Sequence, residues 1–159
     1  MFRSTVVFAN IAAGSGAALC ALIHALSFFD VVPGFLVRLF AATVLAVFPF
    51  GGFTIFLALR VGRTYGVSGV DLSAFIAQRA PRWQRHVGIV VLVYALIHLV
   101  LVAFGAVGAE KSTGPTHVPF VLSAFVAWFY LWFMEVFTVG LRDPKIVEPK
   151  ARRSDQARA

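Results

Sequence analysis

The chain is poor in charged residues and contains a single cysteine, and both shortages restrict the architectures open to it. Charged residues make up 13% of the 159 positions, whereas hydrophobic residues make up 60%. A soluble domain is usually about a quarter charged, because water must solvate its surface. The single cysteine, Cys20, excludes an intramolecular disulfide and every metal motif built on a cysteine pair. We therefore expect lipid to cover much of the apolar surface.

The sequence also lacks the short motifs that mark common enzymes. It contains no nucleotide-binding G-x-x-x-x-G-K, no zinc-protease H-E-x-x-H and no nucleophile-elbow G-x-S-x-G. Whether the chain takes part in an enzyme stays open, and we expect no catalytic activity from this chain alone.

Four apolar segments are long enough to cross a bilayer, which takes roughly 20 helical residues for about 30 Å of hydrocarbon. They cover residues 5–29, 35–59, 87–108 and 118–141. The sequence therefore predicts an all-α polytopic membrane protein, with a four-helix transmembrane domain over 1–141 and a basic polar tail over 142–159. The first segment is longer than the apolar core of a signal peptide, so we expect a retained helix.

Four spans place both termini and the middle loop on one side of the membrane. The basic residues of that side are Arg3, Arg60, Arg63, Arg79, Arg82, Arg85, Arg142, Lys145, Lys150, Arg152, Arg153 and Arg158. Only Arg38 and Lys111 fall on the other side. Because basic loops stay cytoplasmic, both termini are predicted to be cytoplasmic. A bacterial inner membrane fits best, and a mitochondrial inner membrane is the alternative.

The net charge of +7 is explained by these flanking residues and does not indicate a nucleic-acid partner. Basic residues beside apolar spans are typical of contacts with anionic lipids. The residues expected to contact lipid headgroups or a partner protein are Arg60, Arg63, Arg79, Arg82 and Arg85.

The middle loop contains the pattern of a short amphipathic helix. Asp71 is placed to cap its start, and Pro81 is placed to end it. Between them, Leu72, Phe75 and Ile76 fall on one helical face. We expect an interfacial helix on the cytoplasmic leaflet.

Two rows of residues at every fourth position indicate which spans pack together. Small residues form the row Ala9, Ala13, Ala17, Ala21 and Ala25, and large residues form the row Phe125, Phe129, Phe133 and Phe137. Small residues let another helix approach closely. The first and fourth spans run antiparallel, which brings the two rows to matching depths. We predict that the rows face each other.

Polar side chains inside the spans are the best pointers to function, because placing them in hydrocarbon is costly. His98 is predicted near the middle of the third span, with Tyr94 one turn away, and His24 lies toward the outer end of the first span. Histidine is a common axial ligand of haem, so a b-type haem or a quinone at these residues is one hypothesis. The predicted depths oppose the haem, since His24 lies about 11 Å outside the centre of its span. The alternative is a histidine hydrogen-bonded across the bundle.

Glu135 is predicted toward the inner end of the fourth span, where it is a candidate intramembrane proton site. Its depth matches that of Arg60, Arg63 and His86, any of which could pair with it instead. A proton pathway needs a chain of polar groups through the membrane. Glu135, His98 and His24 are predicted at successive depths, which permits such a chain.

These residues support three hypotheses about function. The first is a non-catalytic integral subunit of a larger complex in an energy-transducing membrane, whose partners are other membrane subunits or copies of this chain. It rests on soluble segments that are too short for a catalytic domain. The second is a membrane-anchor cytochrome b or quinone-site subunit of an oxidoreductase, using His98 and His24. The third is a small oligomeric transporter or channel, with Pro49, Glu135 and His98 along its path.

Overall fold

The computed structural model describes residues 2–29, 31–105 and 117–147, and these ranges form helices and short connections. The helices are α1 (Phe2–Phe28), α2 (Gly34–Tyr65), α3 (Val70–Arg79), α4 (Arg82–Ala103), α5 (His117–Arg142) and α6 (Pro144–Val147). The long helices α1, α2, α4 and α5 have the length and apolar composition to cross a membrane. The predicted all-α polytopic fold is therefore confirmed, including the short helix α3 in the middle loop.

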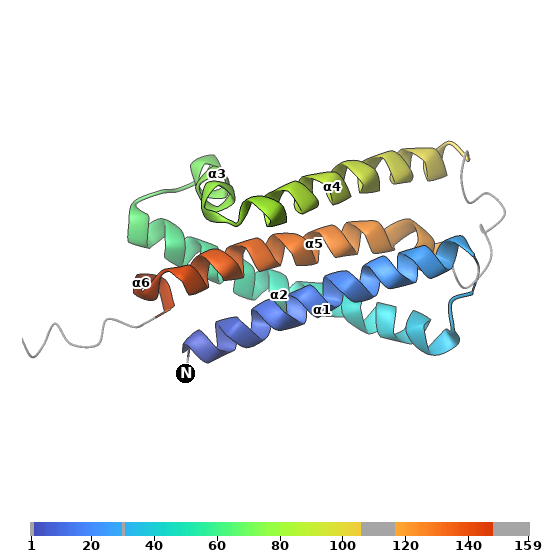
Figure 1. Cartoon of the computed structure of the whole chain (residues 1–159), viewed down its shortest axis with the longest axis horizontal. Coiled ribbons are helices and arrows are strands. Elements are labelled where there is room, and N and C mark those ends of the chain that lie inside the picture. The colour runs from blue at the N-terminus through green and yellow to red at the C-terminus, as the bar shows by residue number, and fades with distance from the viewer. Residues whose placement is uncertain (1, 30, 106–116, 148–159) are drawn as a thin grey trace, which may run out of the picture.

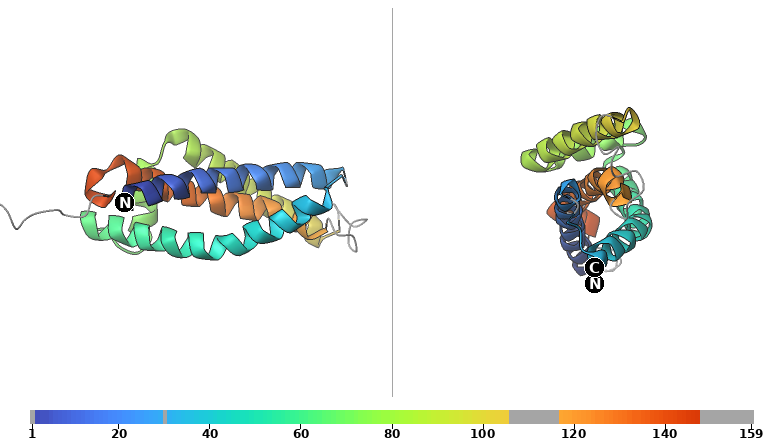
Figure 2. Two further views of the ribbon diagram at one scale, coloured as in Figure 1. Left: turned by 90° about the horizontal axis from the view of Figure 1, so that it is seen from below. Right: turned by 90° about the vertical axis from the view of Figure 1, so that its right-hand side faces the viewer.

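Helix α5 is the centre of the bundle, and the other long helices pack around it (Figure 1). Its most extensive contact is with α1, followed by α4 and α2. Half of its apolar stretch (50%) is buried, compared with 17% of the stretch in α4. Figure 2 shows α1, α2 and α5 as a tight group with α4 to one side. The start of α1, α3 and α6 lie at the same end of the bundle (Figure 1).

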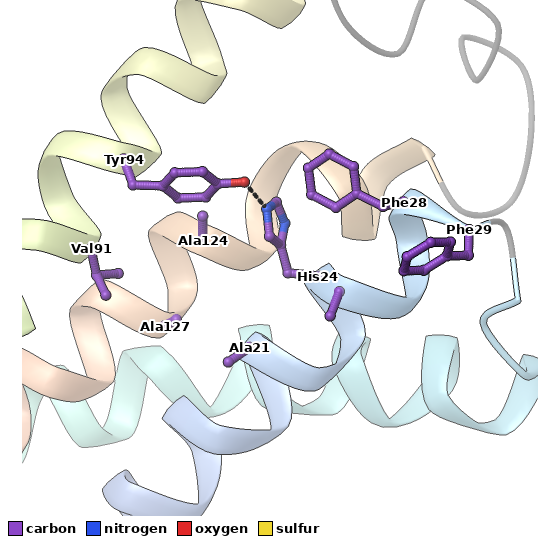
Figure 3. Close-up of a pocket in the computed structure, with 9 residues that line it drawn as sticks. Ala21, His24, Phe28, Phe29, Val91, Tyr94, Ala124 and Ala127 are labelled. Carbon is purple, nitrogen blue, oxygen red and sulfur yellow. Dashed lines mark hydrogen bonds between the residues drawn. The ribbon is translucent and has the colours of Figure 1, made fainter.

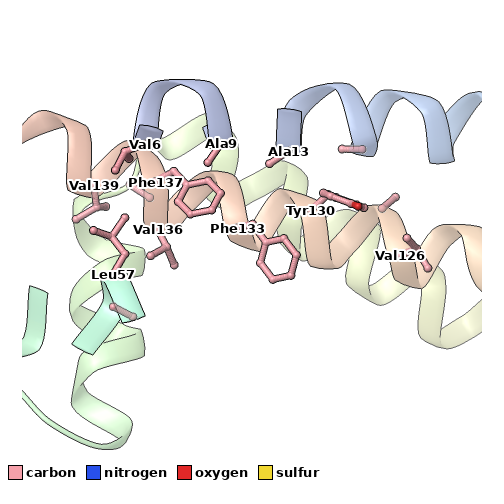
Figure 4. Close-up of a cluster of buried hydrophobic side chains, with 14 of the residues drawn as sticks. Val6, Ala9, Ala13, Leu57, Val126, Tyr130, Phe133, Val136, Phe137 and Val139 are labelled. Carbon is pink, nitrogen blue, oxygen red and sulfur yellow. The ribbon is translucent and has the colours of Figure 1, made fainter. Parts of the chain in front are cut away.

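The contact between α1 and α5 is close because α1 presents small residues to α5 (Figure 4). Ala9, Ala13 and Ala17 are buried there. Gly16 lies against Tyr130, so that a β-carbon at this position would come within 2.9 Å of two ring carbons. The predicted packing of the first span on the fourth is confirmed.

The predicted facing of the alanine and phenylalanine rows holds only in part. Phe133 and Phe137 are buried, but each ring lies 6.4 Å from the ring of Phe50 on α2. Phe129 is exposed on the bundle surface, and Tyr130 lies against α1 instead. A repeat of four residues places side chains on one side of a helix. It does not determine which neighbouring helix that side faces, and α5 has several neighbours.

Helix α2 continues to Tyr65, past the predicted end of its span at residue 59. It ends where Gly66 adopts a left-handed conformation (φ 69°) and donates its N–H to the carbonyl of Gly62. Pro49 lies inside the helix and has no N–H to donate to the preceding turn. Figure 2 shows α2 curving along its length as it passes the bundle.

Helix α3 packs on the bundle through the face predicted from its sequence. Ile76 is buried, and Leu72 and Phe75 pack partly buried against the core. The predicted cap is wrong. The residue before the helix is Gly69 (φ 61°), no side chain caps the start, and Asp71 lies inside the first turn. From there its negative charge still interacts favourably with the positive end of the helix dipole.

Helix α4 spans Arg82–Ala103, whereas the prediction placed the third span at 87–108. Pro81 precedes the first turn, a position where its fixed φ and missing N–H cost nothing. Gly105 (φ 68°) follows the end of the helix. A basic residue ends an apolar run but does not end a helix, so hydropathy misplaced the helix start by more than a turn. This shift matters for the histidines.

The segment after α5 begins with the short helix α6, whose Ile146 is fully buried in the core. The rest of the predicted tail, residues 148–159, lies outside the described residues. The division into a transmembrane domain over 1–141 and a tail over 142–159 stays a prediction.

Candidate functional site

Four polar side chains from three helices meet inside the bundle, and we call them the histidine cluster. Its members are His24 of α1, Tyr94 and His98 of α4, and Ser123 of α5. The Nδ1 atom of His24 lies 2.8 Å from the hydroxyl oxygen of Ser123. The Nε2 atom of His24 lies 2.7 Å from the hydroxyl oxygen of Tyr94. A neutral imidazole has one N–H and one acceptor nitrogen, so the ring donates to one hydroxyl and accepts from the other.

His98 joins the cluster through ring contacts. Its ring centroid lies 4.9 Å from that of His24, edge to face, and 5.8 Å from that of Tyr94, nearly parallel. The Nε2–H of His98 donates to the backbone carbonyl of Phe120 at 3.0 Å. Because a carbonyl oxygen can only accept, this bond places a proton on Nε2. Both histidines and Ser123 are buried, so the cluster is part of the bundle interior.

The contact between the two histidines corrects the predicted difference in their depths. The third span was placed too far along the chain, which put His98 near its centre. Helix α4 ends at Ala103, so His98 lies in its last two turns, as His24 lies in the last two turns of α1. The two helices run in the same direction, since α2 and α3 return the chain to its starting end (Figure 1). The histidines therefore share one level.

An apolar cavity of about 560 Å³ adjoins the cluster, between α1, α4 and α5 (Figure 3). Its polar lining is the hydrogen-bonded pair of His24 and Tyr94, and its other walls are apolar, with Phe28 and Phe29 at one side and Val91 at another. A site of this size with few, fixed polar groups is typical of pockets that bind small molecules.

Small residues on two helices produce this cavity. Ala21 and Ala25 continue the alanine row of α1 beyond its contact with α5, and both are exposed. Ala124 and Ala127 line the cavity from α5. The cavity lies beside these alanines, where α4 stands apart from α1 (Figure 2). The outer part of the predicted packing row is therefore the wall of a pocket.

The geometry does not fit a haem held between His24 and His98. Such a haem needs one nitrogen of each ring directed at a single iron from opposite faces. The His24 nitrogens are both within hydrogen-bonding distance of protein hydroxyls, and Nε2 of His98 donates to a carbonyl. The two rings also meet edge to face without a gap between them. We derive no role for haem at this cluster.

Glu135 lies at a second cavity, of about 370 Å³, formed by α3, α4 and α5. Arg85 lines the same cavity and is the charged group that acts on Glu135, in place of the predicted Arg60, Arg63 or His86. Gly88 gives the carboxylate room, since a β-carbon there would lie 3.2 Å from Oε1. Glu135 follows Ser123 by twelve positions on α5, about 18 Å along the helix axis. The polar groups thus form two separate sites instead of the stepped series predicted from the sequence.

The basic residues of the middle segment have different surroundings. Arg60 lies over the ring of Phe2, 4.7 Å from its centroid. Arg79 lies over Tyr65 and Phe75, 4.3 Å from each centroid. Arg63 and Arg82 are exposed, and Arg85 is half-buried. Their predicted contacts with lipid headgroups or a partner stay predictions.

Sequence reasoning missed three polar residues that join the helices, namely Gln84, Ser123 and Thr138. Ser123 was not predicted as a partner of His24, although it is polar and lies within the fourth span. Near the other end of the bundle, Gln84 Nε2 donates to the hydroxyl of Thr138 at 3.2 Å, and Thr138 donates to Asn10 Oδ1 at 3.5 Å. A search for every hydroxyl and amide within the spans, rather than for titratable groups alone, would have found them.

No family model, curated protein or solved structure matches this chain. Within residues 2–29, 31–105 and 117–147, no group of three or more His, Cys, Asp or Glu residues is placed to hold a metal ion.

Proposed function

We propose that this chain is a small, non-catalytic integral membrane subunit that binds a quinone-type ligand beside the histidine cluster. The observation that carries the proposal is the cavity of about 560 Å³ whose only hydrogen-bonding wall, in the described part of the chain, is the His24–Tyr94 pair. Ligand pockets typically have volumes of about 300–1,000 Å³ and a few oriented polar groups. A quinone is largely apolar and presents carbonyl oxygens that accept hydrogen bonds.

The His24–Tyr94 pair is suited to such a carbonyl. The hydroxyl of Tyr94 can donate to a ligand oxygen, and His24 keeps its other hydrogen bond to Ser123 when it does so. Phe28 and Phe29 offer aromatic faces to a planar ring. The alanines of α1 and α5 leave room for the ring and part of an apolar tail.

The test is binding of a short-chain benzoquinone to the protein in nanodiscs, measured by equilibrium dialysis against empty nanodiscs. We expect Ala25→Leu to reduce binding at least about tenfold, because the added side chain occupies the cavity. Ala18→Leu is the matched control on the exposed side of α1 and should bind as the unaltered protein does.

A second pair of variants tests the polar contact. Tyr94→Phe removes the donor and keeps the ring, and we expect a loss of about fivefold to tenfold in affinity, the effect of one hydrogen bond. Tyr65→Phe makes the same change outside the cavity and should have no effect. Binding to nanodiscs with the protein no greater than to empty ones, or equal binding by all four variants, would refute the proposal.

Membership of a larger complex is a second proposal, favoured by the packing of α4. This helix packs mainly on α5, and most of its apolar surface is exposed in the isolated chain. Native mass spectrometry of the protein extracted in a mild detergent would test it. A particle of fixed stoichiometry with other subunits is the expected result, and a monomer or a homo-oligomer as the sole species would contradict it.

A further inference from the structure

The cavity formed by α3, α4 and α5 contains a cation and an anion that face the same space. Arg85 and Glu135 both line it, and the positive charge of Arg85 acts on Glu135. Neither side chain has a direct salt bridge or hydrogen bond to another residue in the described ranges. Both groups are half-buried, so part of each remains accessible from the cavity. A ligand with charges of both signs can therefore satisfy both.

The polarity of this cavity changes along the bundle axis. Arg85 is near the start of α4, and the carboxylate of Glu135 lies against Gly88, about one turn further into the bundle, so both charges lie toward the end of the bundle that holds α3 (Figure 1). Further into the bundle the walls are Leu92 of α4 and Trp128 of α5, with Trp132 between the two levels. The cavity thus has a charged end toward the membrane surface and an apolar end toward the membrane interior. A phospholipid in one leaflet has its headgroup and its acyl chains in the same order.

The depth of the charged end agrees with a headgroup. Glu135 lies seven positions before Arg142, the last residue of α5, which is about 10 Å along the axis. Helix α5 has 26 residues, or about 39 Å, and so extends a few ångströms beyond a hydrocarbon core of about 30 Å on each side. The backbone of Glu135 therefore lies about 6 Å inside the hydrocarbon edge, about one helical turn from the level where phosphate and glycerol groups begin.

We propose that this cavity binds an aminophospholipid, a lipid whose headgroup carries a phosphate and a primary ammonium. The guanidinium of Arg85 binds the phosphate, and the carboxylate of Glu135 accepts hydrogen bonds from the ammonium. The acyl chain lies along Leu92 and Trp128. An anionic lipid without an amine would satisfy Arg85 but place negative charge beside Glu135. A trimethylammonium headgroup has no N–H to donate to the carboxylate. The site is independent of the quinone-type site proposed above.

Tryptophan fluorescence offers a direct test, because Trp128 and Trp132 line the cavity and bromine quenches tryptophan on contact. The third tryptophan, Trp83, is removed as Trp83→Phe, since it lies exposed on the first turn of α4. The protein is placed in bilayers containing a dibrominated lipid with an ethanolamine, choline or glycerol headgroup. We expect the ethanolamine lipid to quench most, with a relative affinity roughly threefold above the others, the effect of one partly exposed charge pair.

Two charge-removing variants separate the roles of the residues. Glu135→Gln should abolish the preference for ethanolamine over choline, and Arg85→Gln should weaken quenching by all three lipids. Asp71→Asn and Arg82→Gln are the matched controls, since both residues are exposed near this cavity without lining it. Equal quenching by the three lipids, a preference for the glycerol lipid, or an ethanolamine preference that survives Glu135→Gln would overturn the proposal.

Native mass spectrometry provides a readout that does not depend on fluorescence. Protein extracted from a membrane of mixed lipids should retain one ethanolamine phospholipid, and the Glu135→Gln protein should retain it less often. Loss of the quinone binding described above, with this lipid retained, would leave the present proposal standing.

Discussion

At the scale of single residues, Gly16 is a position where the contact between α1 and α5 leaves no room for a side chain. Two ring carbons of Tyr130 lie 2.9 Å from the position of a β-carbon at residue 16. Tyr130 cannot turn aside freely, because its hydroxyl donates to the carbonyl of Thr43 on α2 at 2.8 Å. The ring is thus held between α1 and α2, and it sets the distance of both helices from α5.

We therefore expect Gly16→Ala to lower the free energy of unfolding by about 1–3 kcal/mol, the usual cost of overpacking a core. Gly52→Ala is the matched control, because a β-carbon there meets nothing within 4 Å. Alanine is the better helix former by up to about 1 kcal/mol, so the control should be neutral or stabilising. Thermal unfolding in detergent measures both, and equal transition temperatures for the two variants would contradict the packing described.

The histidine cluster shows what residue types alone could predict of the site. Imidazoles inside apolar spans were singled out together with Tyr94, since buried polar groups are few, and the structure brings these residues into contact. Their mutual contact was not predicted, because it depends on where α4 begins. That start is set by Pro81 in a basic segment, where hydropathy carries no information about helix geometry. Ser123 was missed because a serine in a helix usually bonds its own backbone.

At the scale of helices, the fold also divides into features that residue types predict and features that depend on how the helices are positioned. The four spans and α3 could be predicted from the length and spacing of apolar residues. The packing of α1 on α5 followed from small residues at every fourth position. Which side chains of α5 would face α1 could not be predicted, since α5 has large apolar residues on most of its faces and packs against three long helices. Glu135 was placed at the correct end, but its neighbour Arg85 depended on the rotation of α4.

Helix α4 should be the least protected of the long helices. Only 17% of its apolar stretch is buried, compared with 50% for α5, and it packs mainly on α5. Local opening requires little loss of buried contact in such an element. Hydrogen–deuterium exchange of the isolated chain in detergent, followed by mass spectrometry, should therefore be faster in α4 than in α1 and α5. Equal protection of α4 and α1 would show that contacts beyond those described hold α4 in place.

At the scale of the whole molecule, the gathering of α3, α6 and the start of α1 at one end permits a test of orientation. The distribution of basic residues predicts that this end faces the cytoplasm. In a Cys20→Ala background, Val31→Cys places a thiol in the connection at the opposite end, and Ser68→Cys places one between α2 and α3. Both positions are exposed.

A membrane-impermeant maleimide applied to intact cells should label Val31→Cys and leave Ser68→Cys unlabelled until the membrane is permeabilised. Labelling of Ser68→Cys alone in intact cells would reverse the orientation. Labelling of both before permeabilisation would contradict a fixed four-span topology. Cys20 is fully buried. Its replacement by alanine also removes any slow reaction of its thiol with the maleimide.

The central place of α5 also bears on how the protein is made. Helix α5 is the last of the four long helices to leave the ribosome, yet it supplies the main packing surface for the other three. During synthesis, α1, α2 and α4 enter the membrane with few contacts among themselves. Until α5 inserts between them, these helices remain in the bilayer without their main packing partner. Their backbone N–H and C=O groups are paired within each helix. Chains interrupted before His117 should therefore be recognised and degraded as incomplete, even though three of their spans are already in the bilayer.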